Sequence, residues 1–165
     1  MASCSFFLVT LSLAFLCNCL TFDNVKADLI GDLCSSVANP SFCNHALRSD
    51  PNSAKADLRG LGEVAHDKAT ASAETTLNLA KALGKGKLPR TCVEVIGEAI
   101  DSLNECQGSL RGNDKGTLNI KASAALDDLA TCDDEYGAKE PTNLKQASQT
   151  TQGLISIILA VSNRL

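Results

Sequence analysis

The chain has 165 residues, with 15 Lys and Arg against 19 Asp and Glu, so its formal net charge is −4. An acidic balance argues against a nucleic-acid partner, because binding phosphates requires a basic surface. Two histidines leave little for catalysis, and an aromatic fraction of 4% is low for a groove that stacks ligands. Eight cysteines in so short a chain indicate an oxidising compartment.

Residues 1–27 are predicted to be a secretory signal peptide. An apolar run spans Phe6 to Leu20, and Val25 and Ala27 are the small residues that precede a signal-peptidase site. The run is about 15 residues long, whereas a membrane-spanning helix needs roughly 20. A second apolar run, Leu154–Val161, is shorter still and is expected to be a buried helix end. We therefore expect a secreted chain of residues 28–165 with five cysteines and no membrane partner.

The mature chain is predicted to be helical throughout, because Ala, Leu, Lys and Glu dominate its long segments and no stretch alternates at strand period. Asn39 is expected to cap the second helix and Thr142 the last one. The predicted helices are two short ones, about 29–37 and 40–48, and four long ones, about 53–83, 89–110, 117–136 and 143–162. This order predicts an all-α fold: an α-hairpin over residues 28–50, followed by an antiparallel four-helix bundle over residues 51–165.

Two of the long helices carry core seams that recur at alternating spacings of four and three. These seams are Cys92, Ile96, Ala99, Leu103, Cys106 and Leu110, and then Leu118, Ala122, Ala125, Leu129, Cys132 and Tyr136. A short turn at Gly112 makes the two helices antiparallel, so residues equidistant from it face each other. This geometry predicts a disulfide between Cys92 and Cys132. The same symmetry about residues 38–39 predicts a disulfide between Cys34 and Cys43.

The remaining reactive side chains do not form a recognisable catalytic pattern. Cys106 is left as a free thiol on a core seam, where a cysteine usually behaves as a small buried hydrophobe. A role in dimerisation or redox sensing is the alternative, which the neighbouring Glu105 disfavours. His45 and His66 lack an acidic residue and a nucleophile at usable spacing, and Cys43 with His45 is too little for zinc. No enzyme activity, metal or cofactor is predicted.

An acidic stripe marks the outer face of the second long helix. Glu94, Glu98, Asp101 and Glu105 follow one another at spacings of four, three and four, opposite the core seam of that helix. On the next helix, Asp127, Thr131 and Asp134 also face away from their seam. Taken alone, such a stripe is most often a solvated helix face. The alternative is a surface that binds a basic partner.

Several motifs together resemble the plant invertase and pectin methylesterase inhibitor family. They are Cys34-x8-Cys43, the segments 50–54 and 57–62, the segment 99–103 and the run LNIKASAALDDLATCDDEYG at 118–137. The resemblance covers essentially the whole mature chain. It implies a four-helix bundle with an N-terminal α-hairpin, two disulfides paired as above, and a proteinaceous inhibitor secreted to the apoplast or cell wall.

The esterase inhibitors of that family resemble this chain more than the invertase inhibitors do. Invertase inhibitors typically carry Pro-Lys-Phe in the turn between the second and third bundle helices, and here that turn reads Asp114-Lys115-Gly116. The resemblance implies that the bundle covers the pectin-binding cleft of pectin methylesterase. The residues implied to bind this partner are Glu94, Glu98, Asp101, Thr131 and Asp134.

Two alternatives remain open for the function. One is inhibition of cell-wall or vacuolar acid invertase. The other is a carrier of lipid or another small ligand, although plant lipid-transfer proteins use four disulfides and this mature chain cannot form four. The free protein is expected to be a monomer. Because carboxylates begin to protonate at the lower end of cell-wall pH, inhibition through the acidic stripe is expected to depend on pH.

Overall fold

A computed structural model describes residues 28–84 and 86–165. The predicted signal peptide lies outside the described residues. The elements in chain order are α2 (Leu29–Cys34), α3 (Pro40–Arg48), the 3-10 turn η2 (Pro51–Lys55), α4 (Leu58–Ala82), α5 (Lys87–Gly112), α6 (Lys115–Tyr136), the 3-10 turn η3 (Gly137–Lys139) and α7 (Thr142–Ser162). This part of the chain contains no strand. None of its helices is both long enough and apolar enough to cross a membrane.

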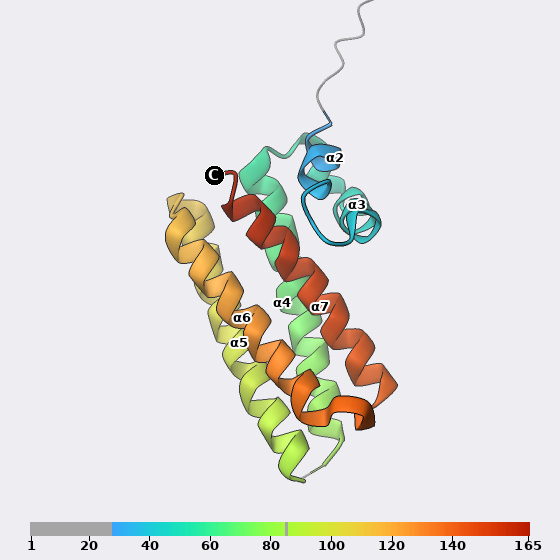
Figure 1. The fold of residues 1–165 in the computed structure, drawn as a ribbon. Coiled ribbons are helices and arrows are strands. Elements are labelled where there is room, and N and C mark those ends of the chain that lie inside the picture. The colour runs from blue at the N-terminus through green and yellow to red at the C-terminus, as the bar shows by residue number, and fades with distance from the viewer. Residues whose placement is uncertain (1–27, 85) are drawn as a thin grey trace, which may run out of the picture.

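The four long helices form the predicted antiparallel bundle (Figure 1). α5 packs against α6 and α4 against α7, and the contacts of α4 with α5 and of α6 with α7 close the ring. Short connections between successive long helices produce this up-and-down order. The hairpin of α2 and α3 packs against α7 and the start of α4 at one end of the bundle (Figure 1). The outer faces of α5 and α6 are therefore left free of the hairpin.

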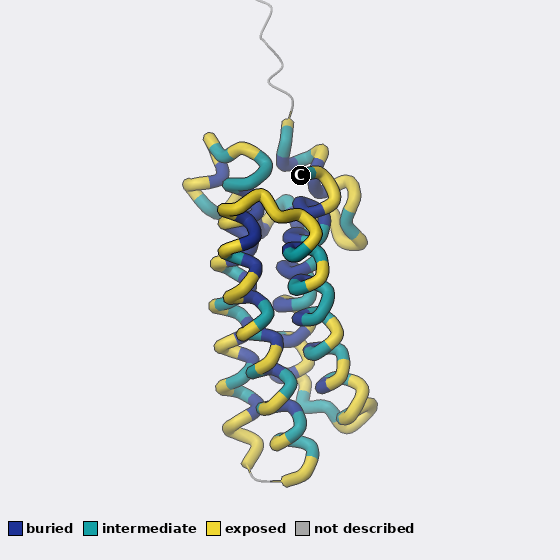
Figure 2. Tube along the Cα trace, turned by 90° about the vertical axis from the view of Figure 1, so that its left-hand side faces the viewer, coloured by how far each residue is buried: buried dark blue, intermediate teal, exposed yellow. Residues whose placement is uncertain are grey.

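The core lies along the inner faces of the four long helices (Figure 2). All six seam residues predicted on α5 are fully buried, as are the first five on α6, whereas Tyr136 is half-buried at the helix end. The apolar run near the C-terminus is also confirmed as a buried helix end, with Ile155, Ile157, Ile158 and Val161 inaccessible to solvent. The period of apolar residues was thus sufficient to locate the core faces of α5 and α6.

Several helix ends differ from the prediction. The first helix stops at Cys34 instead of continuing to about residue 37. α4 begins at Leu58 instead of about residue 53, because η2 comes first and the Asp57 carboxylate accepts the Gly60 N–H at 2.8 Å as the true cap. α5 begins at Lys87, two residues before Pro89. A proline fits within the first turn because its missing N–H has no partner in the helix there.

Capping and turn residues account for the other differences. Asn39 caps α3 as predicted, accepting the Phe42 N–H at 3.1 Å. Thr142, predicted as a cap, is instead the first residue of α7, because the extended backbone that precedes the helix is at Pro141. At the α5–α6 turn, Asn113 and not Gly112 adopts the left-handed conformation, with φ of 55°.

Both predicted disulfides are present. Cys34 and Cys43 join α2 to α3 with a Cα–Cα distance of 5.5 Å, and Cys92 and Cys132 join α5 to α6 at 4.7 Å. Cys106 is free and fully buried. Burial, reinforced by the Glu105 carboxylate, raises the pKa of its thiol to about 11. Such a thiol stays protonated at neutral pH, so a role as a buried core residue fits better than a reactive one.

Candidate functional site

The four acidic side chains predicted to line the outer face of α5 are all exposed. They are Glu94, Glu98, Asp101 and Glu105. Each lies one or two positions along the chain from a buried seam residue, so the spacing of the seam fixes the direction of the stripe. Because α5 is anchored by its core seam, these carboxylates project from a rigid helix and not from a loop.

The predicted residues of α6 are exposed as well and lie beside the start of the α5 stripe. Thr131 and Asp134 flank Cys132, which is bonded to Cys92, and Cys92 is two residues from Glu94. The disulfide therefore holds these side chains at the same level of the bundle. The Thr131 hydroxyl donates to the Asp127 carbonyl at 2.8 Å, which leaves its oxygen free to accept a hydrogen bond from a partner.

Two further charged residues of α6 lie near the acidic stripe of α5. Lys121 of α6 lies 2.8 Å from the Glu105 carboxylate of α5. Asp128 is half-buried, and burial raises the pKa of its carboxyl, with additional contributions from the carboxylates of Glu98 and Asp127. Sequence reasoning missed both residues. Lys121 and Glu105 are nearly equidistant from the α5–α6 turn, so the symmetry that paired the cysteines could have found them.

The end of α6 holds a second acidic group, which faces α7. The Asp133 carboxylate accepts a hydrogen bond from Gln152 Nε2 of α7 at 2.7 Å. Burial, followed by the nearby Asp133 carboxylate, raises the pKa of Glu140 to about 7. One oxygen each of Asp133, Tyr136 and Glu140 is buried without a hydrogen-bond partner. We refer to Asp133, Tyr136, Glu140 and Gln152 as the corner cluster, and no sequence pattern had indicated it.

One of the two histidines is buried in the bundle and the other is exposed. His66 is 5% exposed, and its Nε2 donates to the Leu103 carbonyl of α5 at 2.9 Å. Its Nδ1 lies 3.1 Å from Asp67, so both ring nitrogens are engaged. His45 is exposed on α3. Among the described residues, no group of three or more His, Cys, Asp or Glu side chains is placed to hold a metal ion.

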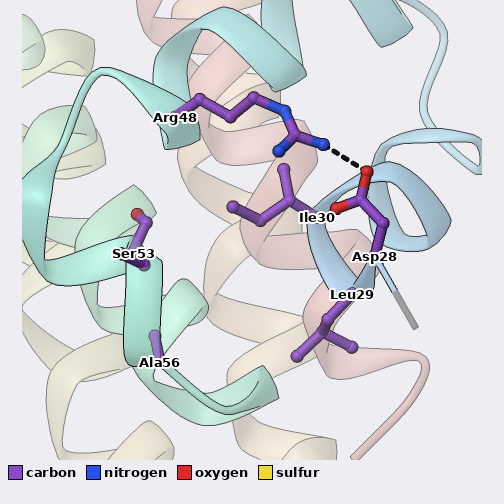
Figure 3. Close-up of a pocket in the computed structure, with 7 residues that line it drawn as sticks. Asp28, Leu29, Ile30, Arg48, Ser53 and Ala56 are labelled. Atoms are coloured by element: carbon purple, nitrogen blue, oxygen red, sulfur yellow. Dashed lines mark hydrogen bonds and ion pairs between the residues drawn. The ribbon is translucent and has the colours of Figure 1, made fainter. Parts of the chain in front are cut away.

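A hollow of about 550 Å³ lies between the hairpin and η2. Figure 3 shows the Arg48 side chain extending past Ile30 to pair with Asp28, while Ser53 and Ala56 line the other side. The two charges at this hollow already neutralise each other. The hollow lies on the hairpin side of the molecule, away from the stripe on α5, and nothing in its lining resembles a catalytic centre.

The fold is that of a disulfide-bonded all-α protein, with a four-helix bundle and an N-terminal α-hairpin. Residues 28–161 match the family described as plant invertase/pectin methylesterase inhibitor. The chain belongs to this family. It is 41% identical over 154 residues to a pectinesterase inhibitor from Actinidia deliciosa, covering 86% of this chain and 83% of that relative.

Two further similarities extend over most or all of the chain. Pectinesterase inhibitor 2 from Arabidopsis thaliana is 30% identical over 174 residues, covering 100% of this chain and 94% of the relative. Among solved structures, a mutant form of a pectin methylesterase inhibitor from Arabidopsis matches with a TM-score of 0.74 and 30% identity. That match covers 82% of this chain and 96% of the other. The bundle-and-hairpin architecture is thus one that the family shares.

Proposed function

We propose that this chain is a secreted inhibitor of pectin methylesterase, which acts in the cell wall by covering the pectin-binding cleft of the enzyme in a reversible complex. The observation that carries the proposal is the exposed acidic surface on the disulfide-linked pair α5 and α6. The names of the relatives described above supply the target enzyme.

The contact residues proposed for the complex are called here the acidic face. They are Glu94, Glu98, Asp101, Thr131 and Asp134, all of them exposed. A surface held by two packed helices and a disulfide loses little conformational freedom on binding, which favours affinity. Carboxylates arranged on one side attract basic groups at the rim of a cleft and repel acidic ones, which favours fast association with one partner over others.

Inhibition of acid invertase is the second candidate, because the family includes invertase inhibitors. The turn between α5 and α6, where invertase inhibitors carry Pro-Lys-Phe, has only one residue of that motif. This residue, Lys115, is exposed at the start of α6. The preceding Asp114 is occupied as the helix cap, accepting the Thr117 N–H at 3.0 Å. This turn therefore has no aromatic side chain that could enter an invertase active site.

The test of the proposed function is titration of the secreted protein into assays of a plant pectin methylesterase and of an acid invertase. We expect the esterase to lose its activity near stoichiometric amounts of inhibitor, while the invertase keeps its activity. Inhibition of the invertase alone would favour the second candidate, and inhibition of neither enzyme would overturn both.

The proposed signal peptide is tested by N-terminal sequencing of the same preparation, since cleavage after Ala27 leaves Asp28 as the first residue.

The acidic face is tested by reversing two of its charges. The double variant Glu98→Lys and Asp101→Lys is expected to weaken esterase inhibition about 100-fold, because lost attraction is replaced by repulsion. The control reverses the same number of charges on exposed positions of α4, with Glu63→Lys and Glu74→Lys. Circular dichroism and thermal unfolding should be unchanged in both. Equal inhibition by the two double variants would show that the stripe is an ordinary solvated surface.

A further inference from the structure

Ile120 is an exposed apolar side chain on the same helix as part of the acidic face. Its side chain is 67% exposed, whereas the other large exposed hydrophobic residue among those described, Leu83, is 37% exposed at the end of α4. A β-branched residue is a poorer helix former than the Lys, Glu or Ala usual at such positions. Within the free protein, Ile120 gains little packing that would offset this cost.

The position of Ile120 places it on the outer surface of α6. Steps of seven residues connect Ile120 to Asp127 and then to Asp134. Two turns of helix separate residues seven apart, so the three side chains lie on nearly the same line along α6. The rise of the helix puts Ile120 about 10 Å from Asp127 along its axis. Ile120 therefore continues the row that contains Asp134 towards the α5–α6 turn.

The surface around Ile120 differs from the acidic face in two ways: the charge next to it is paired, and several of its residues are glycines without side chains. Next to it, the Lys121 ammonium neutralises Glu105 at 2.8 Å. Three exposed glycines occupy the last turns of α5 and the first turn of α6: Gly108, Gly112 and Gly116. A Cβ added at Gly108 or Gly112 would meet no atom within 4 Å, so the surface is low there. Ile120 thus lies beside a neutralised ion pair, and the exposed cations Arg111 and Lys115 are at the nearby turn.

We propose that Ile120 is an apolar contact with pectin methylesterase, so that the interface combines the acidic face with one apolar side chain near the α5–α6 turn. This inference rests on the proposed function and deepens it. The continuous row from Asp134 through Asp127 to Ile120 favours the same partner over a separate one. The partner surface that fits Ile120 is an apolar patch beside the basic or polar groups that meet the carboxylates.

A second copy of this chain fits the same surface poorly. A symmetric pair that covered the whole row from Ile120 to Asp134 would bring the two Asp127 side chains towards each other, because Asp127 lies at the middle of this row. Like charges in an interface are unfavourable, particularly when water is excluded around them. An anionic lipid surface is disfavoured for the same reason, because the acidic face would be repelled by it. Pairing with an enzyme that offers basic groups avoids this repulsion.

The test compares three single variants in the esterase titration, each produced from the full chain. Ile120→Ser is expected to raise the inhibition constant about tenfold or more, as truncating an apolar interface contact does. Ile120→Leu should stay within about twofold of the wild type because it keeps the apolar volume. Leu83→Ser, at the opposite end of the bundle, should inhibit like the wild type. Thermal unfolding of all three reports whether the fold is retained.

The outcomes separate this inference from the proposed function. If Ile120→Ser inhibits as well as the wild type while the Glu98 and Asp101 double reversal does not, the interface excludes Ile120 and the inference is wrong. If the wild type itself fails to inhibit, the proposed function has failed first. Gel filtration supplies the remaining comparison: a wild-type dimer that Ile120→Ser converts to a monomer would identify a second copy as the occupant and overturn the inference.

Discussion

The two helix pairs of the bundle are held together in different ways. α5 and α6 are joined by the Cys92–Cys132 disulfide. α4 and α7 are joined by hydroxyl groups instead: Thr151 Oγ1 of α7 lies 2.8 Å from Ser72 Oγ and 3.2 Å from Thr76 Oγ1 of α4. The second pair is also the one that the hairpin covers, with Phe42 so close to α7 that a Cβ at Gly153 would be 2.8 Å from its ring.

The difference indicates a division of roles within one bundle. The outer side of α4 and α7 must match the hairpin, so its residues are constrained by packing. The outer side of α5 and α6 has no such neighbour, and its residues are free to meet an external partner. A covalent bond between α5 and α6 keeps their relative position fixed where no further element supports it. The proposed binding surface thus coincides with the pair that is cross-linked.

The largest effect is expected from removing that cross-link. Replacing both Cys92 and Cys132 by Ala should lower the free energy of unfolding by about 4 kcal/mol, because the bond closes a long loop in the unfolded chain. The equivalent change at Cys34 and Cys43 should cost about 2.5 kcal/mol, since that loop is short. Urea denaturation of the two double variants measures both values. A larger loss at the hairpin disulfide would contradict the division of roles described above.

The periodic spacing of apolar residues was sufficient to predict how α5 and α6 are joined. The seams of α5 and α6 and the turn between them determined the disulfide, and the residues opposite the seams were predicted to be exposed. The hydroxyl contacts of α4 with α7 were not predictable in this way. Ser72, Thr76 and Thr151 are polar, and a polar residue on a helix is normally assigned to its exposed side, whereas Thr76 and Thr151 are fully buried.

The next effect concerns the hydroxyl contacts of the other pair. Thr151→Val keeps the shape of the side chain but leaves the Ser72 and Thr76 hydroxyls without their shared partner. We expect a loss of about 1–3 kcal/mol in the free energy of unfolding. Thr150→Val is the matched control, because Thr150 is exposed and its hydroxyl donates only to the Gln146 carbonyl within α7. Equal losses for the two variants would show that the contacts between α4 and α7 contribute nothing specific.

The corner cluster, where α6 meets α7, gives a smaller effect that depends on pH. The pKa of Glu140 is raised from 4.5 to about 7 in the folded protein by burial and by Asp133, with Lys145 acting in the opposite direction. The folded state therefore binds this proton more tightly than the unfolded state does. The stabilisation is complete below about pH 4.5 and is lost as pH rises through about 7. The pKa of Tyr136 is raised as well, by burial and by Glu140.

We expect the wild type to lose on the order of 1 kcal/mol of stability between pH 5 and pH 7 through this group, after discounting for its partial exposure. Glu140→Gln removes the titrating proton and should flatten this part of the pH profile of urea denaturation. Glu135→Gln, at an exposed position of α6, is the control and should keep the wild-type profile. A profile that stays steep in Glu140→Gln would assign the pH dependence to other carboxyls.

Sequence reasoning could not find the corner cluster for a physical reason. Asp133 and Asp134 are adjacent and chemically identical, but successive helix positions point about 100° apart. Asp134 is exposed, whereas Asp133 is half-buried against Gln152 of α7. The other carboxyl of the cluster, Glu140, comes after the 3-10 turn η3. The periodic pattern of the helices does not predict the path of the chain there. The exposed acidic face was predictable because it depends on one helix phase, whereas the corner cluster depends on how two helices are joined.

The smallest effect is expected from the ion pair on the outer side of α5 and α6. Lys121 and Glu105 are both partly exposed, and such pairs contribute about 0.2–1 kcal/mol. A double-mutant cycle with Lys121→Ala and Glu105→Ala should give a coupling free energy in this range, and raising the salt concentration should reduce it. A coupling above about 2 kcal/mol would mean that this pair, and not the disulfide alone, fixes α5 against α6. A value within the expected range leaves the cross-link as the dominant connection on the side proposed to face the partner, since an exposed ion pair cannot replace a covalent bond there.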